Sequence, residues 1–252
     1  MKNIFSDIGI NLGDKILVSS DILKLLIKYK NKKEKFDPNF IIDMLLERVG
    51  KSGTLIFPTF NWDFCKGKDY DYKKTKSNCG SLTNLVLDRK DFLRTKNPVY
   101  SFAVSGKDKD FICEMKHKNC FGLDSPFGYL INNNGKNLFI DVHYREGGFP
   151  FVHVAEQEAG VKYRFLKKFS GNYIGLNNKK SKINCLLYVR DKKLNVGRTL
   201  INKRFDETLK KINAYRELVV EDTFLSIMDI KKAYELLVKD LKNKGNLIYN
   251  EI

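Results

Sequence analysis

A histidine and a glutamate three residues apart, His153 and Glu156, are the pair in this sequence best suited to moving a proton. Residues 147–160 predict a short helix that begins near Pro150 and ends at Gly160, which places both side chains on one helix face. A carboxylate beside an imidazole fixes the tautomer of the ring and supports its charged form, as a general base requires. The same spacing also occurs in purely structural hydrogen bonds, so the pair alone leaves both interpretations open.

Cysteine chemistry is the next candidate, because a thiolate can act as a nucleophile or a metal ligand. The cysteines are odd in number, with no Cys-x-x-Cys motif and no histidine at a zinc-ligand spacing. We therefore expect free buried thiols, no metal site and no catalytic cysteine. The positions are Cys65, Cys79, Cys113, Cys120 and Cys185.

The 252-residue chain carries a formal net charge of +16. Its lysines are spread along the whole sequence, and no helix-turn-helix, zinc finger or aromatic RNA-binding motif accompanies them, so we do not expect nucleic-acid binding. A basic surface also attracts small polyanions such as nucleotides, which is the simpler interpretation. No apolar run is long enough to span a bilayer and the first residues do not form a signal peptide, so we expect a cytoplasmic protein with no membrane partner.

Strands and helices alternate over the first sixty residues. Residues 16–18 predict a buried strand, and the polar residues Ser19, Ser20 and Asp21 cap a helix over 22–29. A second helix over 38–49 leads to a strand over 54–57, which ends at Pro58-Thr59-Phe60. This alternation favours a layered α/β core, in which ligands bind beyond the carboxyl ends of the strands.

The rest of the chain continues this pattern. A polar, aromatic stretch over 61–76 predicts a surface excursion. We predict helices over 80–89, 108–116, 126–131 and 200–212 and a last helix that starts near Ser226, with strands over 100–104, 137–142, 183–189 and 247–249. No repeat, linker or change of composition divides the chain, so we expect one α/β domain over residues 1–252.

Five segments in order resemble the antibiotic N-acetyltransferase family, which is typified by aminoglycoside 3-N-acetyltransferases and differs in fold from the GNAT acetyltransferases. The segments are residues 12–20 (LGDKILVSS), 55–60 (LIFPTF), 94–106 (RTKNPVYSFAVSG), 122–130 (GLDSPFGYL) and 152–156 (VHVAE). The resemblance covers about the first two thirds of the chain. It implies a single three-layer α/β/α domain with a central mixed sheet, and transfer of an acyl group from acyl-CoA to an amine.

The resemblance also implies roles at matching positions. His153 would be catalytic, with Glu156 beside it. The first strand-to-helix turn, the Pro-Thr-Phe turn and the Ser-Pro helix start would approach coenzyme A, which implies cofactor contacts for Ser19, Ser20, Thr59 and Ser125.

Three departures from the family pattern bear on the acceptor. The family commonly has His at Ser19, Glu at Asn84 and Gly at Asp141. We therefore take Asn84, Asp141 and the neighbouring Arg145 as candidate substrate-binding residues.

Charge distinguishes two kinds of acceptor. Aminoglycosides are polycations and favour an acidic pocket, whereas a nucleotide-linked amino sugar carries a diphosphate that needs cations. Basic residues around the proposed catalytic helix favour the second kind; they are Arg145, Lys162, Arg164 and Lys167.

Some members of the resembling family acylate dTDP-linked 3-amino-3,6-dideoxyhexoses for bacterial surface polysaccharide. Together with the charge, the resemblance therefore implies transfer of an acetyl or 3-hydroxybutyryl group from acyl-CoA to such a sugar nucleotide. An aminoglycoside 3-N-acetyltransferase is the alternative, and a basic nucleic-acid-binding protein with an inactive acyltransferase fold is a third. The acyl chain, the sugar and the oligomeric state stay open.

Overall fold

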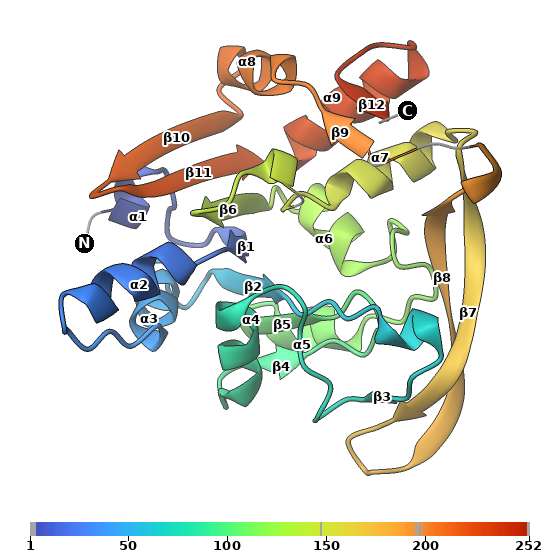
Figure 1. Cartoon of the computed structure of the whole chain (residues 1–252), viewed down its shortest axis with the longest axis horizontal. Helices are drawn as coiled ribbons and strands as arrows, with labels where there is room; N and C mark the ends of the chain where they lie inside the picture. Colours follow the sequence, from blue (N-terminus) through green and yellow to red (C-terminus); the bar gives the residue numbers. More distant parts are fainter. Residues whose placement is uncertain (1–3, 147, 195–196, 198, 251–252) are drawn as a thin grey trace.

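The computed structural model describes residues 4–146, 148–194, 197 and 199–250. Gly147, which begins the segment around His153, and the two ends of the predicted 1–252 domain lie outside these residues. A seven-stranded mixed sheet forms the centre, in the order β10-β11-β6-β1-β2-β5-β4 (Figure 1). Its strands are β1 (Lys15–Ser20), β2 (Thr54–Pro58), β4 (Leu93–Arg94), β5 (Phe102–Gly106), β6 (Lys136–Ile140), β10 (Tyr215–Val220) and β11 (Thr223–Asp229).

The middle of this sheet is parallel. β1 pairs with β2 on one side, with Leu17 opposite Ile56, and with β6 on the other, with Leu17 opposite Asn137. All three strands therefore end at the same edge of the sheet, where the chain leaves at Ser20, Pro58 and Ile140. This is the edge of the sheet at which the sequence predicts that ligands bind.

Antiparallel strands flank the parallel centre, which confirms the predicted mixed sheet. β5 pairs with β2, and β11 pairs with β6. The predicted last helix is present, but its predicted start near Ser226 is wrong, because Ser226 lies within β11 and α9 begins at Ile230. Asp229 caps that helix by accepting a hydrogen bond from the backbone N–H of Lys232.

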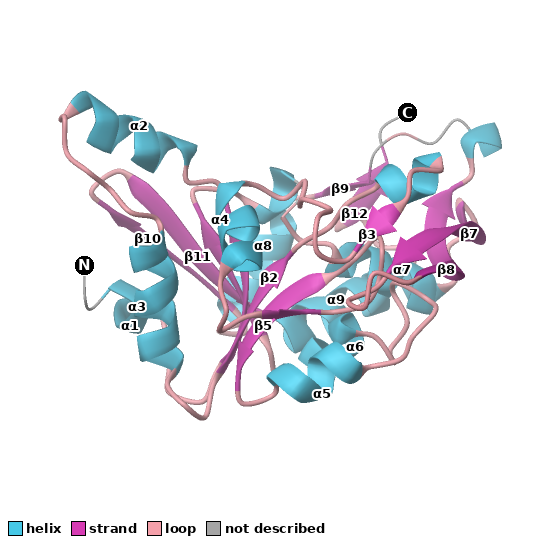
Figure 2. Cartoon of the chain, turned by 90° about the horizontal axis from the view of Figure 1, so that it is seen from below, coloured by secondary structure: helices cyan, strands magenta, loops and turns pink. Residues whose placement is uncertain are grey.

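Helices cover both faces of the sheet, as the alternation of apolar residues along its strands requires. Ile16 and Val18 pack on one side with α3, whereas Leu17 packs on the opposite side with α6, α7 and α9 (Figure 2). These helices are α1 (Ile4–Asp7), α2 (Leu23–Asn31), α3 (Asn39–Val49), α4 (Ser81–Leu85), α5 (Lys109–Glu114), α6 (Pro126–Asn132), α7 (Phe151–Ala159), α8 (Arg204–Lys211) and α9 (Ile230–Lys242). Within the described residues, no helix is long and apolar enough to cross a membrane.

Two small sheets extend the core. A long antiparallel hairpin of β7 (Arg164–Ile174) and β8 (Lys180–Arg190) pairs with β3 (Tyr70–Asp71), and β9 (Thr199–Ile201) pairs with β12 (Ile248–Asn250). The hairpin runs along one side of the molecule (Figure 1). Its first strand was not predicted, and the predicted helix over 200–212 is partly wrong, because β9 precedes α8. Short 3-10 turns complete the chain: Asp63–Lys66, Val86–Asp88, Tyr144–Glu146 and Lys192–Leu194.

Candidate active site

A cavity of about 1030 Å³ opens at the carboxyl ends of the parallel strands. Ser19 and Ser20 line it from the end of β1, and Pro58 lines it from the end of β2. The opposite wall comes from α7 and the β7–β8 hairpin, which contribute His153 and Tyr188. The volume is large enough for two substrates, since ordinary ligand pockets occupy about 300–1,000 Å³.

His153 and Glu156 form a close pair on α7. The distance between His153 Nδ1 and Glu156 Oε2 is 2.7 Å. The imidazole side chain is 26% exposed and lines the cavity, whereas the Glu156 side chain is fully buried. Since the carboxylate accepts the Nδ1 proton, Nε2 is the ring nitrogen that can accept a proton from a ligand.

Glu156 is held from both of its oxygens. The hydroxyl of Tyr163 donates to Oε1 over 3.0 Å, and Nε of Arg164 lies 2.8 Å from Oε2. Arg164 is itself mostly buried and donates to the backbone carbonyl of Tyr188 over 3.2 Å. This arrangement fixes the carboxylate behind His153. Burial, together with the negative charge of Glu156, raises the pKa of Tyr188.

Ser19 lies at the cavity wall with its hydroxyl engaged. It donates to the backbone carbonyl of Gly148 over 2.9 Å and accepts from the side-chain amide of Asn137 over 3.1 Å. These bonds join the end of β1 to the segment that leads into α7. Ser20 lines the same wall.

The structure does not bring Thr59 and Ser125 to this wall. The Thr59 hydroxyl is fully buried and lies 2.8 Å from the hydroxyl of Ser101. The Ser125 hydroxyl is also buried and caps α6 by accepting from the backbone N–H of Phe127. Both hydroxyls serve local structure, and their predicted contact with coenzyme A stays a prediction that their positions do not support.

The three candidate substrate-binding residues lie in different settings. Asp141 has a φ of +50° and accepts a hydrogen bond from the backbone N–H of Phe224, so it closes the pairing of β6 with β11 away from the cavity lining. Arg145 lines the cavity, and its guanidinium lies 3.7 Å from Asp206 Oδ2. Asn84 does not line it.

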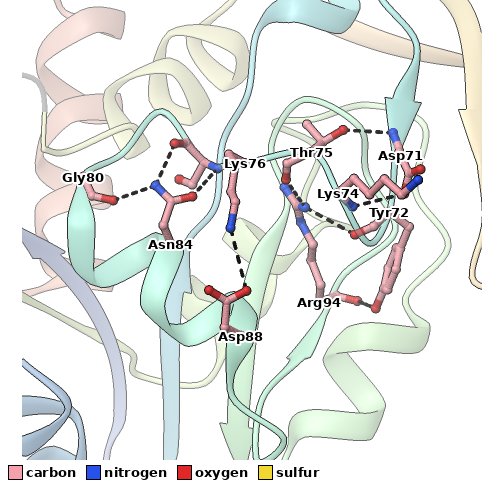
Figure 3. Close-up of polar contacts among 10 residues, drawn as sticks. Asp71, Tyr72, Lys74, Thr75, Lys76, Gly80, Asn84, Asp88 and Arg94 are labelled. Carbon is pink, nitrogen blue, oxygen red and sulfur yellow. Dashed lines mark hydrogen bonds and ion pairs between the residues drawn. The ribbon is translucent and has the colours of Figure 1, made fainter.

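Asn84 instead holds a loop that does. Its carboxamide accepts from the backbone N–H of Ser77 and donates to the carbonyls of Ser77 and Gly80 (Figure 3). Between these two residues lie Asn78 and Cys79, which both line the cavity. Burial raises the pKa of the Cys79 thiol, so it stays protonated at neutral pH and does not act as a thiolate nucleophile.

The cavity wall is basic. Among the described residues that line it there is no Asp or Glu, whereas four cations contribute: Arg145, Arg164, Arg190 and Lys192. Of the four basic residues singled out from the sequence, Lys162 and Lys167 do not line the cavity. Arg190 ends β8 and Lys192 follows it; both were missed, because nothing in the sequence shows that the hairpin folds back to this wall.

Aromatic side chains form the wall beyond β2. Trp62 is 39% exposed, and Phe60, Tyr100 and Phe121 line the same cavity. The Phe121 ring centre lies 5.4 Å from that of His153. The sequence prediction of a surface excursion over 61–76 missed this contribution, since only the tertiary structure turns Trp62 toward the strand ends.

One group of described side chains could in principle ligate a metal ion, namely His143, Asp206 and Glu217, whose ligand atoms lie within 4.8 Å of one another. Arg145 lies 3.4 Å from His143 Nε2 and pairs with Asp206, and Lys210 pairs with Glu217 at 2.5 Å. Cationic side chains of the protein already neutralise both carboxylates, so the cluster functions as an ion-pair network beside the cavity.

A family model described as aminoglycoside 3-N-acetyltransferase matches residues 30–242. Comparison with curated protein sequences finds no match.

Solved structures share the fold. A crystal structure of the aminoglycoside acetyltransferase AAC(3)-Xa superimposes with a TM-score of 0.76 at 16% identity, over 96% of this chain and 91% of that chain. AAC-IIIb in a binary complex with CoASH gives 0.75 at 15% identity, over 97% and 95%. AAC-VIa bound to sisomicin gives 0.73 at 14% identity, over 97% and 96%.

Proposed function

The chain belongs to the aminoglycoside 3-N-acetyltransferase family and is an acyl-CoA-dependent N-acetyltransferase, and from this premise we propose that its acceptor is a nucleotide-linked amino sugar. The observation that carries the proposal is the cavity wall, which combines His153 with four cationic side chains and, among its described residues, no carboxylate; two of the cations, Arg145 and Arg164, also pair with Asp206 and Glu156 outside the lining. A diphosphate is stabilised by such a wall, whereas a polycationic aminoglycoside is repelled by it. A cytoplasmic role in surface polysaccharide biosynthesis is part of this proposal.

The proposed mechanism is direct transfer. A neutral amine of the acceptor attacks the thioester carbonyl, and His153 Nε2 removes the proton from the nitrogen as the C–N bond forms. The C–S bond then breaks, and the leaving coenzyme A thiolate takes the proton from the His153 imidazolium, which restores the neutral base. Glu156 holds the Nδ1 proton and stabilises the imidazolium that forms in the transition state.

Backbone geometry at the strand ends supports a place for the acyl donor. Ser20 ends β1 at the cavity, and its neighbour Ser19 is held in place by Gly148 and Asn137. AAC-IIIb, a structural neighbour, carries CoASH. We propose that the acyl-CoA lies along this turn, with an acetyl or 3-hydroxybutyryl group directed toward His153.

A thiol-release assay tests the proposal. Purified protein is given acetyl-CoA or 3-hydroxybutyryl-CoA with a panel of amino-sugar nucleotides and a panel of aminoglycosides that includes sisomicin. We expect release of coenzyme A with a nucleotide-linked amino sugar. Efficient turnover of aminoglycosides without any turnover of sugar nucleotides would show that the acceptor is an antibiotic instead. Sisomicin is included because the structural neighbour AAC-VIa binds it.

The same preparation separates a third possibility. Salt-sensitive binding of DNA or RNA without release of coenzyme A from any acyl-CoA would indicate an inactive fold used for nucleic-acid binding.

A further inference from the structure

Two side chains in the cavity have no part in the proposed proton transfer, Trp62 and Asn78. Trp62 is the one tryptophan of the chain. Both residues line the same cavity as His153, and the backbone N–H of Asn78 donates to the carbonyl of Phe60, two residues before Trp62, over 2.8 Å. The two segments that carry them are therefore joined directly.

The indole is held by its edge. Its Nε1 donates to the hydroxyl of Tyr100 over 3.4 Å, and the two ring planes meet at 81° with ring centres 6.3 Å apart. Tyr100 therefore does not stack on the indole. Tyr100 is itself fixed between Phe60 and Phe121, with ring centres 4.6 and 4.8 Å away. A rigid support thus presents an indole that is 39% exposed.

Asn78 is positioned from behind. The Asn84 carboxamide makes three hydrogen bonds to the backbone on both sides of it (Figure 3). In addition, the side chain of Asn61 donates to the carbonyl of Lys76 over 2.9 Å. The loop is therefore fixed, while the Asn78 side chain itself is exposed. Its carboxamide offers one acceptor and two donors, the complement of the polar edge of a nucleobase.

We propose that Trp62 and Asn78 form a nucleobase subsite, in which the base stacks on the indole and its edge is hydrogen-bonded by the carboxamide. A flat indole with a cationic wall in the same cavity suits a ligand that is planar at one end and phosphorylated at the other. Two substrates could supply the base. If it is the base of the acceptor nucleotide, the inference rests on the proposed function; the other source is the adenine of coenzyme A.

Fluorescence of the single tryptophan tests the subsite without turnover. Wild-type protein is titrated with thymidine diphosphate and with coenzyme A, and with the base-free probes pyrophosphate and pantetheine. Quenching by thymidine diphosphate but not by pyrophosphate supports the subsite and assigns it to the acceptor. Quenching by coenzyme A but not by pantetheine supports it and assigns it to the donor. Absence of quenching by both nucleotides would overturn it.

Steady-state kinetics of Trp62→Leu and Asn78→Ala give a second measurement. We expect the KM of the base-bearing substrate to rise about tenfold or more in Trp62→Leu, as for a lost stacking partner, with kcat within a few-fold of wild type. Phe165→Leu, at an exposed aromatic outside the cavity lining, is the matched control and should leave both constants unchanged.

Different results would contradict the nucleobase subsite and the proposed acceptor. Turnover of an amino-sugar nucleotide with an unchanged KM for both substrates in Trp62→Leu would overturn the subsite and keep the function. Turnover of aminoglycosides alone would overturn the acceptor assignment, and the fluorescence titration would still decide whether a base binds to Trp62.

Discussion

Burial separates the roles of the two residues in the His–Glu pair. Glu156 has no exposed surface and is held by Tyr163 and Arg164, so its carboxylate cannot reach a substrate. His153 reaches the cavity and carries Nε2 on the side away from that carboxylate. The geometry thus favours the imidazole as the group that meets the amine.

Replacement of His153 by Asn tests this assignment. Asparagine keeps a polar side chain but cannot take a proton from an amine, so we expect kcat/KM to fall by roughly 10²–10⁴-fold, as is typical when a general base is lost. Thiol release measures the rate, and an unchanged midpoint of urea unfolding would show that the fold is intact. Near-normal turnover would remove His153 from the mechanism.

Replacement of Glu156 by Gln tests the support behind the histidine. The variant keeps the shape of the side chain but removes the charge that faces His153 and Arg164, so we expect a loss of kcat and a lower free energy of unfolding, since a buried cation loses its partner. Tyr163→Phe is the control, because it removes one hydrogen bond to the other oxygen. Equal effects of the two variants would contradict a special role of the charge.

The sequence correctly predicts contacts between side chains where their spacing within one helix decides the geometry. His153 and Glu156 meet because residues three apart share a helix face. Thr59 and Ser125 come from matching motifs, yet their hydroxyls turn into the core, since packing rather than motif sets the direction of a side chain. Trp62 was missed because a single aromatic residue in a polar stretch has no periodicity to interpret.

At the scale of elements, the cavity depends on loops that are fixed by single polar side chains. Asn84 in α4 holds the 77–80 loop, and Arg94 in β4 holds the turn before it. The guanidinium of Arg94 donates to the backbone carbonyl of Thr75 (Figure 3), and it also donates to the carbonyl of Thr59. Both residues act on the site through backbone that they position.

Replacement of Asn84 by Ala should loosen the loop that carries Asn78. Three hydrogen bonds are lost, each worth about 0.5–1.5 kcal/mol, so we expect the KM of the base-bearing substrate to rise several-fold with little change in kcat. Steady-state kinetics measure this split. The control is Lys76→Ala, which removes a surface ion pair with Asp88 at 3.7 Å and should leave KM unchanged.

Replacement of Arg94 by Met should lower global stability. Arg94 is 5% exposed, donates also to Ser101, and lies over the Tyr70 ring at 5.1 Å. Its removal leaves the Thr75 carbonyl without this donor, at a cost of about 1–3 kcal/mol for an unpaired group, whereas the Thr59 carbonyl keeps the hydroxyl of Ser101. Urea unfolding measures the change, and Lys96→Met, at an exposed ion pair, is the control. A loss no greater than that of the control would contradict this role.

Elements with a clear apolar period were predicted from the sequence, and strands without a buried apolar run were not. The apolar stripe of α3 and the buried runs of β1 and β2 are local signals. β7 has no buried residue and forms because β8 pairs with it along its whole length. β10 similarly depends on β11. Tertiary pairing of this kind leaves no pattern within a single strand.

At the scale of the whole molecule, the excess of positive charge predicts a preference for anions but not where they bind. Folding brings basic residues from three separate elements to one wall, since Arg145 follows β6, Arg164 begins β7 and Arg190 ends β8. Only the topology reveals this convergence. Conversely, Lys162 and Lys167 lie within three residues of Arg164 in the sequence and do not line the cavity.

Global stability should also depend on pH through His117, which is half-buried next to Asn97. Burial lowers the pKa of His117 below its ordinary value of 6.5. Between these two pKa values the unfolded chain binds the proton more strongly than the folded chain, so the free energy of unfolding falls as the pH drops below 6.5. One group contributes a slope of at most about 1.4 kcal/mol per pH unit.

Urea unfolding at pH 7.5 and 5.5 measures this dependence. The difference in free energy of unfolding between the two pH values should be smaller in His117→Gln than in the wild type, because the carboxylates titrate equally in both proteins. An identical difference would exclude His117 as the source of the acid sensitivity.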